Sequence, residues 1–156
     1  MFSDLVKRGL LVEQPRLLVI DGGKGIRQAI SQVFGRWAPI QRCQVHKRRN
    51  VESHLPHNRI GWVRRQLEAA WKAKTYEAGL KKLKALAASL DESHPSAAKS
   101  IREGMAETLT LLKLGIGSTL AKTLRSTNPI ENMNGMIRKF TTVSYTHLTL
   151  PTKRIV

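Results

Sequence analysis

Two acidic residues of this sequence stand where a carboxylate could take part in chemistry, and Asp21 is the first. It follows a short apolar run, residues 17–20, and precedes Gly22 and Gly23. Such a run with turn residues after it is typical of a buried strand, and ligand sites in open α/β sheets usually form at the carboxyl ends of the strands. Asp21 is therefore a candidate site residue, although it could instead cap the helix that follows.

Glu131 is the second candidate. Asn128 followed by Pro129 is typical of a helix start, with the asparagine as the cap and the proline as the first helical residue. Glu131 then lies in the first turn, where it could serve a site or simply interact with the helix dipole, an interaction worth about 0.3–1 kcal/mol. The polar residues 126–128 are suited to phosphate contacts. We expect this helix to bury an apolar face formed by Ile130, Met133, Ile137 and Phe140.

Cys43 and His46, with two residues between them, have the spacing of one of the two ligand pairs of a zinc site. A structural zinc ion takes four ligands, and the sequence has one cysteine, so a full zinc site is not expected. His54 and His57 leave a Cys-His-His arrangement open. Otherwise we interpret Cys43 as a buried residue and His46 as a residue near the candidate site.

Local patterns predict the elements that must hold these residues. We expect a short helix at 2–11, a strand at 17–20, an amphipathic helix at 25–35, a strand at 39–45 and a cationic helix from His46. The order strand, helix, strand, helix is typical of an α/β fold.

From Arg59 to about Gly115 the composition changes to Ala, Leu, Lys, Arg and Glu, which predicts a helical block. We expect three helices whose apolar stripes form a core: Trp62, Val63, Leu67, Ala70 and Trp71; Tyr76, Leu80, Leu83, Leu86, Ala87 and Leu90; and Ile101, Met105, Leu109 and Leu112. The remaining faces carry Lys72, Lys74, Lys81, Lys82 and Lys84, which could be a solvated surface or a DNA track.

Length and charge limit the classes of protein to consider. The 156 residues suffice for one cored domain with an insertion, and the net charge of +16 favours a polyanion, naturally nucleic acid, over a generally basic protein. The single cysteine fits a reducing compartment, and no apolar run approaches the length of a membrane span or a signal peptide core. We therefore expect a cytoplasmic protein with no membrane partner.

Three segments, taken together, carry a resemblance to a known family: Val-Ile-Asp-Gly-Gly-Lys-Gly at 19–25, Gln-Arg-Cys-Gln-Val-His-Lys-Arg-Arg-Asn at 41–50 and Arg-Ser-Thr-Asn-Pro-Ile-Glu at 125–131. In this order, with a helical block before the third, they resemble the transposases of bacterial insertion sequences of the Mutator type, which have a ribonuclease H-like catalytic domain. The resemblance covers about residues 2–142.

The resemblance implies a catalytic triad of two aspartates and one glutamate that holds Mg²⁺ or Mn²⁺. Asp21 matches the second aspartate and Glu131 the glutamate, and both would be metal ligands, while Cys43 and His46 match motif residues. The first aspartate belongs to a segment that should precede Met1. We therefore expect this chain to be an amino-terminally truncated piece.

The implied fold class is α/β, a partial ribonuclease H-like fold with a mainly α-helical insertion between the second catalytic aspartate and the glutamate. We expect four segments: the partial core at 1–58, the insertion at 59–120, the returning glutamate helix at 121–142, and at 143–156 a tail that resembles read-through of sequencing-adaptor DNA and is excluded from the fold.

The implied function is metal-dependent cleavage and strand transfer of transposon-end DNA. The resemblance also implies that the enzyme is a homodimer and that this fragment of its catalytic domain is inactive alone. The alternative is a non-catalytic basic DNA-binding or dimerising module, and a nuclease of the same fold fits the segments less well. The expected DNA-contacting residues flank the catalytic segments and are Arg42, Lys47, Arg48, Arg49, Arg125, Asn128, Arg138 and Lys139.

Overall fold

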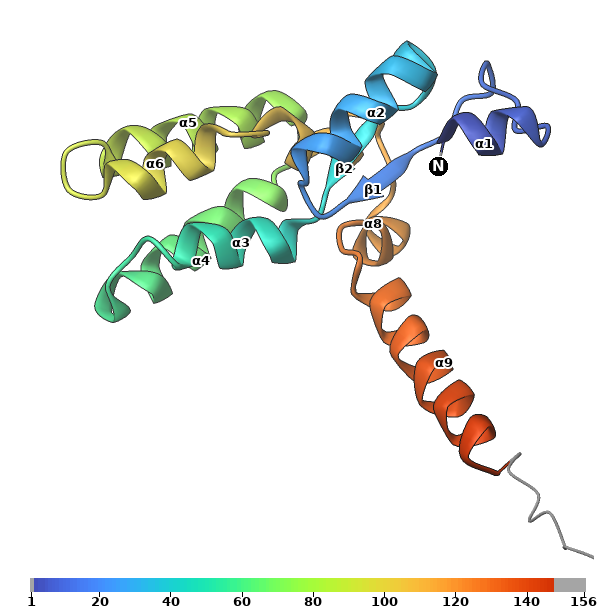
Figure 1. Cartoon of the computed structure of the whole chain (residues 1–156). Helices are drawn as coiled ribbons and strands as arrows, with labels where there is room; N and C mark the ends of the chain where they lie inside the picture. The colour runs from blue at the N-terminus through green and yellow to red at the C-terminus, as the bar shows by residue number, and fades with distance from the viewer. Residues whose placement is uncertain (1, 148–156) are drawn as a thin grey trace, which may run out of the picture. The chain divides into compact units, whose positions relative to one another are not determined.

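The computed structural model describes residues 2–147, and the side chains of residues 2–139. The chain divides into two compact units, the first ending at Ser126 and the second beginning at Thr127. The first unit contains a small sheet and a block of helices, and the second contains the helix α9 (Asn128–His147). The fold is thus mixed α and β, mostly helical (Figure 1).

The sheet has two short parallel strands, β1 (Leu18–Ile20) and β2 (Ile40–Arg42), paired so that Ile20 lies opposite Arg42. They are connected by α2 (Lys24–Phe34) and the short helix η1 (Gly35–Trp37). The helix α1 (Phe2–Lys7) precedes them. Ile20, Ile30, Phe34 and Ala38 form a small core that confirms the predicted strand, helix, strand order.

The second strand is shorter than the one predicted at 39–45. It ends at Arg42, Cys43 occupies the N-cap position, and α3 (Gln44–Glu52) has already begun at Gln44. The backbone N–H of Gln44 donates to the carbonyl of Arg125 at 2.8 Å, which satisfies a helix-terminal donor that has no partner within the helix. The alternation of polar and apolar residues predicts a strand as far as Val45, but Gln44 and Val45 already belong to the helix, and Gln44 is buried on its inner face.

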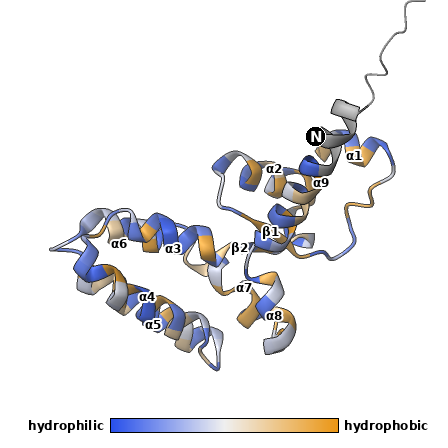
Figure 2. Cartoon of the chain, turned by 90° about the horizontal axis from the view of Figure 1, so that it is seen from below, coloured by the Kyte–Doolittle hydropathy of each residue, from blue (hydrophilic) through white to orange (hydrophobic). Residues whose placement is uncertain are grey.

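The helical block contains α4 (His57–Trp71), α5 (Tyr76–Leu90) and α6 (Pro95–Arg102). The predicted stripes are confirmed, because their members form or pack against one core that also receives Val51 from α3. Apolar and polar residues alternate along each of these ribbons, as amphipathic helices require (Figure 2).

The third predicted helix is wrong in one respect, because it does not run on to Leu112. It ends at Arg102, Glu103 is extended, and Gly104 adopts a φ of +64°. The chain then forms η2 (Ala106–Leu109) and α7 (Thr110–Lys113). Glycine just after a helix readily takes this left-handed conformation, which ends the helix and turns its last carbonyls toward other partners.

The segment after this break holds the sheet to the helical block through buried amide groups. Gln41 Nε2 donates to the carbonyl of Thr108 at 3.1 Å, and its Oε1 accepts from the N–H of Leu111 at 3.1 Å. Thr110 Oγ1 donates to the carbonyl of Ile40 at 2.6 Å. These bonds cross about 70 positions of sequence, so β2 is fixed to η2 and α7 by contacts that local patterns do not encode.

The carboxyl-terminal helix differs from expectation in its burial. α8 (Ser118–Leu124) precedes it, and α9 continues to His147, into the segment that was expected to be a non-native tail. Ile130, Met133 and Ile137 are exposed by 59%, 47% and 54%, so the apolar face predicted to be buried is not buried in the described chain. The side chain of Phe140 lies outside the described residues. None of the helices described between residues 2 and 147 is both long and apolar enough to cross a bilayer.

Gly104 and Gly115 provide a matched pair for measuring what the helix break contributes. Both have a positive φ, +64° and +63°, but a methyl group on Gly104 would lie 2.7 Å from Arg42 Nη1, whereas one on Gly115 would meet nothing within 4 Å. We expect Gly115→Ala to lower the free energy of unfolding by about 1 kcal/mol and Gly104→Ala by at least about 2 kcal/mol. Urea unfolding of both variants measures this, and equal losses would contradict the packing of Arg42 on this turn.

Candidate functional site

Asp21 lies immediately after β1, at the carboxyl end of the sheet, and its side chain is exposed. Its Oδ1 accepts a hydrogen bond from the backbone N–H of Gly23 at 3.0 Å. Gly23 is the N-cap residue of α2, and no side chain caps that helix. Asp21 is thus held in a local turn of its own and does not act as the helix cap, which was the structural alternative.

Cys43 follows β2 at the same edge of the sheet, where its backbone N–H donates to the carbonyl of Ile20 at 2.7 Å. The thiol is fully buried, lies 3.2 Å from Nδ1 of His46, and donates to the hydroxyl oxygen of Ser126 at 3.8 Å. These contacts bring the end of the first unit, at Ser126, to the residue beside the Asp21 strand. Within residues 2–147, no three or more His, Cys, Asp or Glu side chains are grouped as metal ligands, so His54 and His57 do not complete a site with Cys43.

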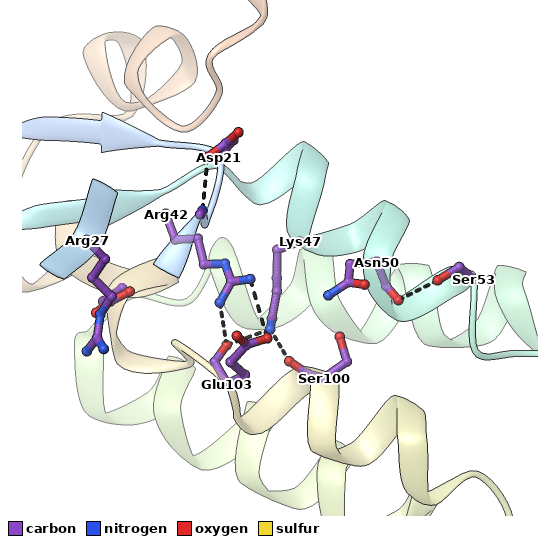
Figure 3. Close-up of polar contacts among 10 residues, drawn as sticks. Asp21, Arg27, Arg42, Lys47, Asn50, Ser53, Ser100 and Glu103 are labelled. Atoms are coloured by element: carbon purple, nitrogen blue, oxygen red, sulfur yellow. Dashed lines mark hydrogen bonds and ion pairs between the residues drawn. The ribbon is translucent and has the colours of Figure 1, made fainter. Parts of the chain in front are cut away.

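Arg42, the last residue of β2, points its guanidinium into the space below the turn that follows Asp21 (Figure 3). Its Nη1 donates to the carbonyl of Glu103 at 3.0 Å, and its Nη2 lies 3.6 Å from the carboxylate of the same residue. Only 7% of Arg42 is exposed. A cation at this position is favourable because the carbonyl end of a helix carries partial negative charge.

Lys47, one turn into α3, is 2% exposed and donates from Nζ to the carbonyl oxygens of Ser100 and Glu103. Burial lowers the pKa of its ammonium group from 10.5 to about 8. The nearby charge of Arg42 also lowers this pKa, while Glu103 and Glu107 act in the opposite direction. Arg42 and Lys47 therefore neutralise the carbonyl end of α6 from inside, and the structure gives neither one an exposed surface for phosphate.

A hollow of about 600 Å³ opens beside the Asp21 turn. It is lined by residues of the turn and α2, including Gly22 and Arg27, and on the other side by Glu103 and Glu107. Arg27 Nε forms an ion pair with the carboxylate of Glu107 across it. The hollow thus places both signs of charge next to the Asp21 turn, a polar environment suited to hydrated ions rather than to an apolar ligand.

The other predicted DNA contacts in the first unit have different surroundings. Arg48 lies 3.7 Å from each of the carboxylates of Glu52 and Glu68, whereas Arg49 is exposed. Arg125 is half-buried and lines a second hollow, of about 490 Å³. That hollow also carries Gln44, Trp71, Lys72 and Lys122. The lysines expected on the outer faces of the helical block, from Lys72 to Lys84, are exposed.

Glu131 lies in the first turn of α9, in the second unit. Its N–H donates to the carbonyl of Thr127, whose hydroxyl donates in turn to the Glu131 carboxylate. The helix therefore begins one residue earlier than predicted, with Thr127 before the first helical residue and Asn128 within the helix. Arg138 and Lys139 are exposed farther along α9. A favourable interaction of Glu131 with the helix dipole is compatible with this position.

Comparison with known proteins places the chain in a family. The family model for transposases of the Mutator family matches residues 1–148. This chain belongs to the Mutator family of transposases. The resemblance carried by the three segments is thereby confirmed.

Three relatives of this Mutator-family chain are transposases for insertion sequence elements. It is 28% identical over 142 residues to that of IST2 from Acidithiobacillus ferrooxidans, covering 91% of this chain and 47% of the relative. It is 29% identical to that of ISRM3 from Rhizobium meliloti, covering 89% and 34%, and 28% identical to that of IS905 from Lactococcus lactis, covering 83% and 32%. The chain thus spans between about a third and about a half of the length of these relatives.

Sequence reasoning on this Mutator-family chain missed the residues that organise the space under Asp21. Glu103 and Gly104 were expected inside a helix, although a glycine near a helix end is a known stop signal. The buried amides of Gln41 and Gln44 carried no such signal, because only their long-range partners distinguish them from surface glutamines.

The lowered pKa of Lys47 makes the stability of the chain depend on pH. Between pH 8 and 10.5 the unfolded chain holds a proton on this amine that the folded chain has released, so the free energy of unfolding rises with pH across this window. Urea unfolding at intervals from pH 7.5 to 9.5 measures the slope. Lys47→Met should flatten it, while Lys84→Met, at an exposed position, should leave it intact; an unchanged slope in Lys47→Met would refute the assignment.

Proposed function

We propose that this Mutator-family chain is part of a transposase catalytic domain that cuts transposon-end DNA and transfers its strands, and that Asp21 and Glu131 are two of the metal-binding carboxylates. The observation that carries the proposal is the meeting of three elements at one edge of the sheet. Asp21 follows β1, Cys43 follows β2, and Ser126 contacts the Cys43 thiol. Glu131 comes five residues after Ser126, so the second carboxylate is close to this edge in sequence.

The strand, helix, strand arrangement with parallel pairing supports a partial ribonuclease H-like fold as part of this proposal. In that fold the helical block would be the insertion between Asp21 and Glu131. Parallel strands connected by a helix place their carboxyl ends at one edge, which is where a carboxylate site would form.

The two carboxylates suit Mg²⁺ or Mn²⁺ in their chemistry. Both ions prefer oxygen ligands and keep several waters, and both Asp21 and Glu131 are exposed carboxylates at the ends of regular elements. Asp21 and Glu131 would hold such ions, which would supply activation of the attacking oxygen and stabilisation of the leaving oxygen in phosphodiester chemistry. The family resemblance implies a third carboxylate, so we propose that the 156-residue chain alone holds an incomplete set.

The proposed DNA surface consists of basic and polar residues of α9 and of the family segments 41–50 and 125–131. Arg49, Arg138 and Lys139 are exposed, and Arg48, Arg125 and Asn128 are partly exposed. Arg42 and Lys47 are left out of this surface because their charged groups are buried against backbone carbonyls. The net charge of +16 supports DNA as the partner, and the lone cysteine fits action in the cytoplasm.

A second candidate is a non-catalytic DNA-binding or dimerising module. The exposed apolar residues of α9, which include Ile130 and Met136, favour it, because an exposed apolar face is typical of an association surface. A homodimer is also part of the first proposal. The two functions differ in whether DNA is cut.

Nicking of supercoiled DNA distinguishes the two functions. We expect no Mg²⁺-dependent nicking by the 156-residue chain, and nicking by a protein extended at its amino end to the length of the relatives. In the extended protein, Asp21→Ala or Glu131→Ala should lower the rate by about a hundredfold or more, since each removes several kcal/mol of transition-state stabilisation. Glu92→Ala, at an exposed position, is the control. Continued cutting after either site substitution would exclude that residue from the active site.

DNA binding by the chain should depend steeply on salt and little on sequence. Each phosphate that a Lys or Arg neutralises contributes about −0.9 to the slope of log K against log salt concentration. We expect a slope of several units in fluorescence anisotropy, reduced by about one unit in Arg49→Gln or Lys139→Gln. Arg102→Gln is the control, because Arg102 forms an ion pair with Asp91. A flat salt response would refute the proposed surface.

A further inference from the structure

The guanidinium of Arg42 is packed directly against the backbone of two glycines. A methyl group built on Gly22 would lie 2.5 Å from Arg42 Nε, and one built on Gly104 would lie 2.7 Å from Nη1. Distances this short are not found for real side chains, so neither position accepts any residue larger than glycine without displacing Arg42. The guanidinium therefore fills the space between the turn after Asp21 and the turn after α6.

Arg42 is also fixed on the side away from Asp21. Its Nη1 makes the hydrogen bond to the Glu103 carbonyl, and its Nη2 makes the ion pair with the Glu103 carboxylate (Figure 3). Its Nε, the atom nearest the Gly22 position, is buried and has no hydrogen-bond partner among the described residues. An arginine held in this way has a fixed orientation, because its guanidinium plane cannot turn without breaking the contacts to Glu103.

The turn that packs against Arg42 follows Asp21 and holds its carboxylate. Gly22 adopts a φ of +111°, which few other residues reach, and Gly23 donates its N–H to Asp21 Oδ1. The orientation of the carboxylate thus depends on the backbone of these two glycines. Gly22 lies directly on Arg42.

We propose that Arg42 is a positioning residue for the Asp21 carboxylate, and that through Arg42 the end of α6 controls how well Asp21 binds a divalent metal ion. This inference rests on the proposed function, because it takes Asp21 as a metal ligand. It assigns a role to a buried arginine whose guanidinium is bound within the protein. It also gives the helical block a part in the site, since Glu103 holds the guanidinium in place.

The charge of Arg42 and its positioning role predict opposite results when the residue is replaced. Removing a positive charge near a carboxylate favours the binding of a cation, so Arg42→Met should tighten metal binding if charge alone matters. Loss of a residue that orients a ligand instead weakens metal binding, typically by 10–100-fold. The direction of the change therefore separates the two effects, and general destabilisation of the fold would not produce it in molecules that remain folded.

The test uses the full chain labelled with ¹⁵N and titrated with Mn²⁺, whose paramagnetism broadens the amide signals of nearby residues. We expect saturable broadening at Gly22 and Gly23 in the unsubstituted chain and its loss in Asp21→Asn. Arg42→Met should shift the midpoint to a Mn²⁺ concentration about tenfold higher. Arg42→Lys keeps the charge but lacks the planar fork, so it should also weaken binding.

Arg102→Met is the matched control. Arg102 ends the same helix and forms an ion pair with Asp91, but it lies against neither glycine turn. Its substitution should leave the Mn²⁺ midpoint unchanged. If Arg42→Met does not give the dispersed spectrum of a folded protein, the more conservative Arg42→Lys decides the question.

The outcomes distinguish the role of Asp21 as a metal ligand from the positioning role of Arg42. Broadening that is absent at Gly22 and Gly23, or that persists in Asp21→Asn, would refute Asp21 as a metal ligand of this chain and with it the positioning role, whereas the proposed function is decided by the nicking assay. Broadening that depends on Asp21 but is equal or tighter in the Arg42 variants would overturn the positioning role alone. An equal weakening in Arg102→Met would also overturn it, because the effect would then not be specific to Arg42.

Discussion

The rest of the first unit depends on two cations buried against the carbonyl end of α6. Arg42 arrives from the sheet and Lys47 from α3, and both donate to the carbonyl of Glu103. Taking two like charges out of water is costly, and the lowered pKa of Lys47 expresses that cost. The cost is offset by carbonyl groups that the end of a helix leaves without partners and by the partial negative charge that they carry. Arg42 belongs to β2 and Lys47 to α3, so their bonds to the Glu103 carbonyl couple the sheet and α3 to the end of α6.

This coupling matters because the sheet is too small to be stable by itself. Two strands of three residues and four buried apolar side chains bury little surface, and isolated two-stranded sheets are marginal in water. The helical block has a much larger core and supplies a rigid surface for β2, through Gln41 and Thr110 as well as through Arg42. The edge that carries Asp21 is therefore held by contacts with the helical block that follows it in sequence.

Periodicity and turn residues predicted the elements whose formation depends on their own local sequence. The strand before Asp21, the helix after it and the apolar stripes of α4 and α5 were all found, because burial of a repeating pattern is a property of the segment itself. The end of β2 and the break at Gly104 were missed, because they depend on partners far away in sequence. Lys47 and Ser100 are 53 positions apart, and nothing near Lys47 in a run of basic residues distinguishes a buried lysine from a solvated one. The three family segments predicted the candidate carboxylates where physics alone left their structural alternatives open.

The two carboxylates of the proposed site are held in place by different contacts. Asp21 is fixed before any metal arrives, by its bond to Gly23 and by the arginine beneath the turn, and such preorganisation lowers the cost of binding an ion. Glu131 is held by Thr127 at the start of an exposed helix that belongs to the second unit. In this proposal Asp21 would bring to the ion a carboxylate that is already fixed, and Glu131 a carboxylate that is held by the first turn of its own helix. The apolar residues exposed on α9 favour a state in which that helix is covered, since burial of apolar surface contributes about 25 cal/mol per Å². What covers α9 would therefore affect Glu131 through the helix that holds it, whereas Asp21 is fixed by contacts within the first unit.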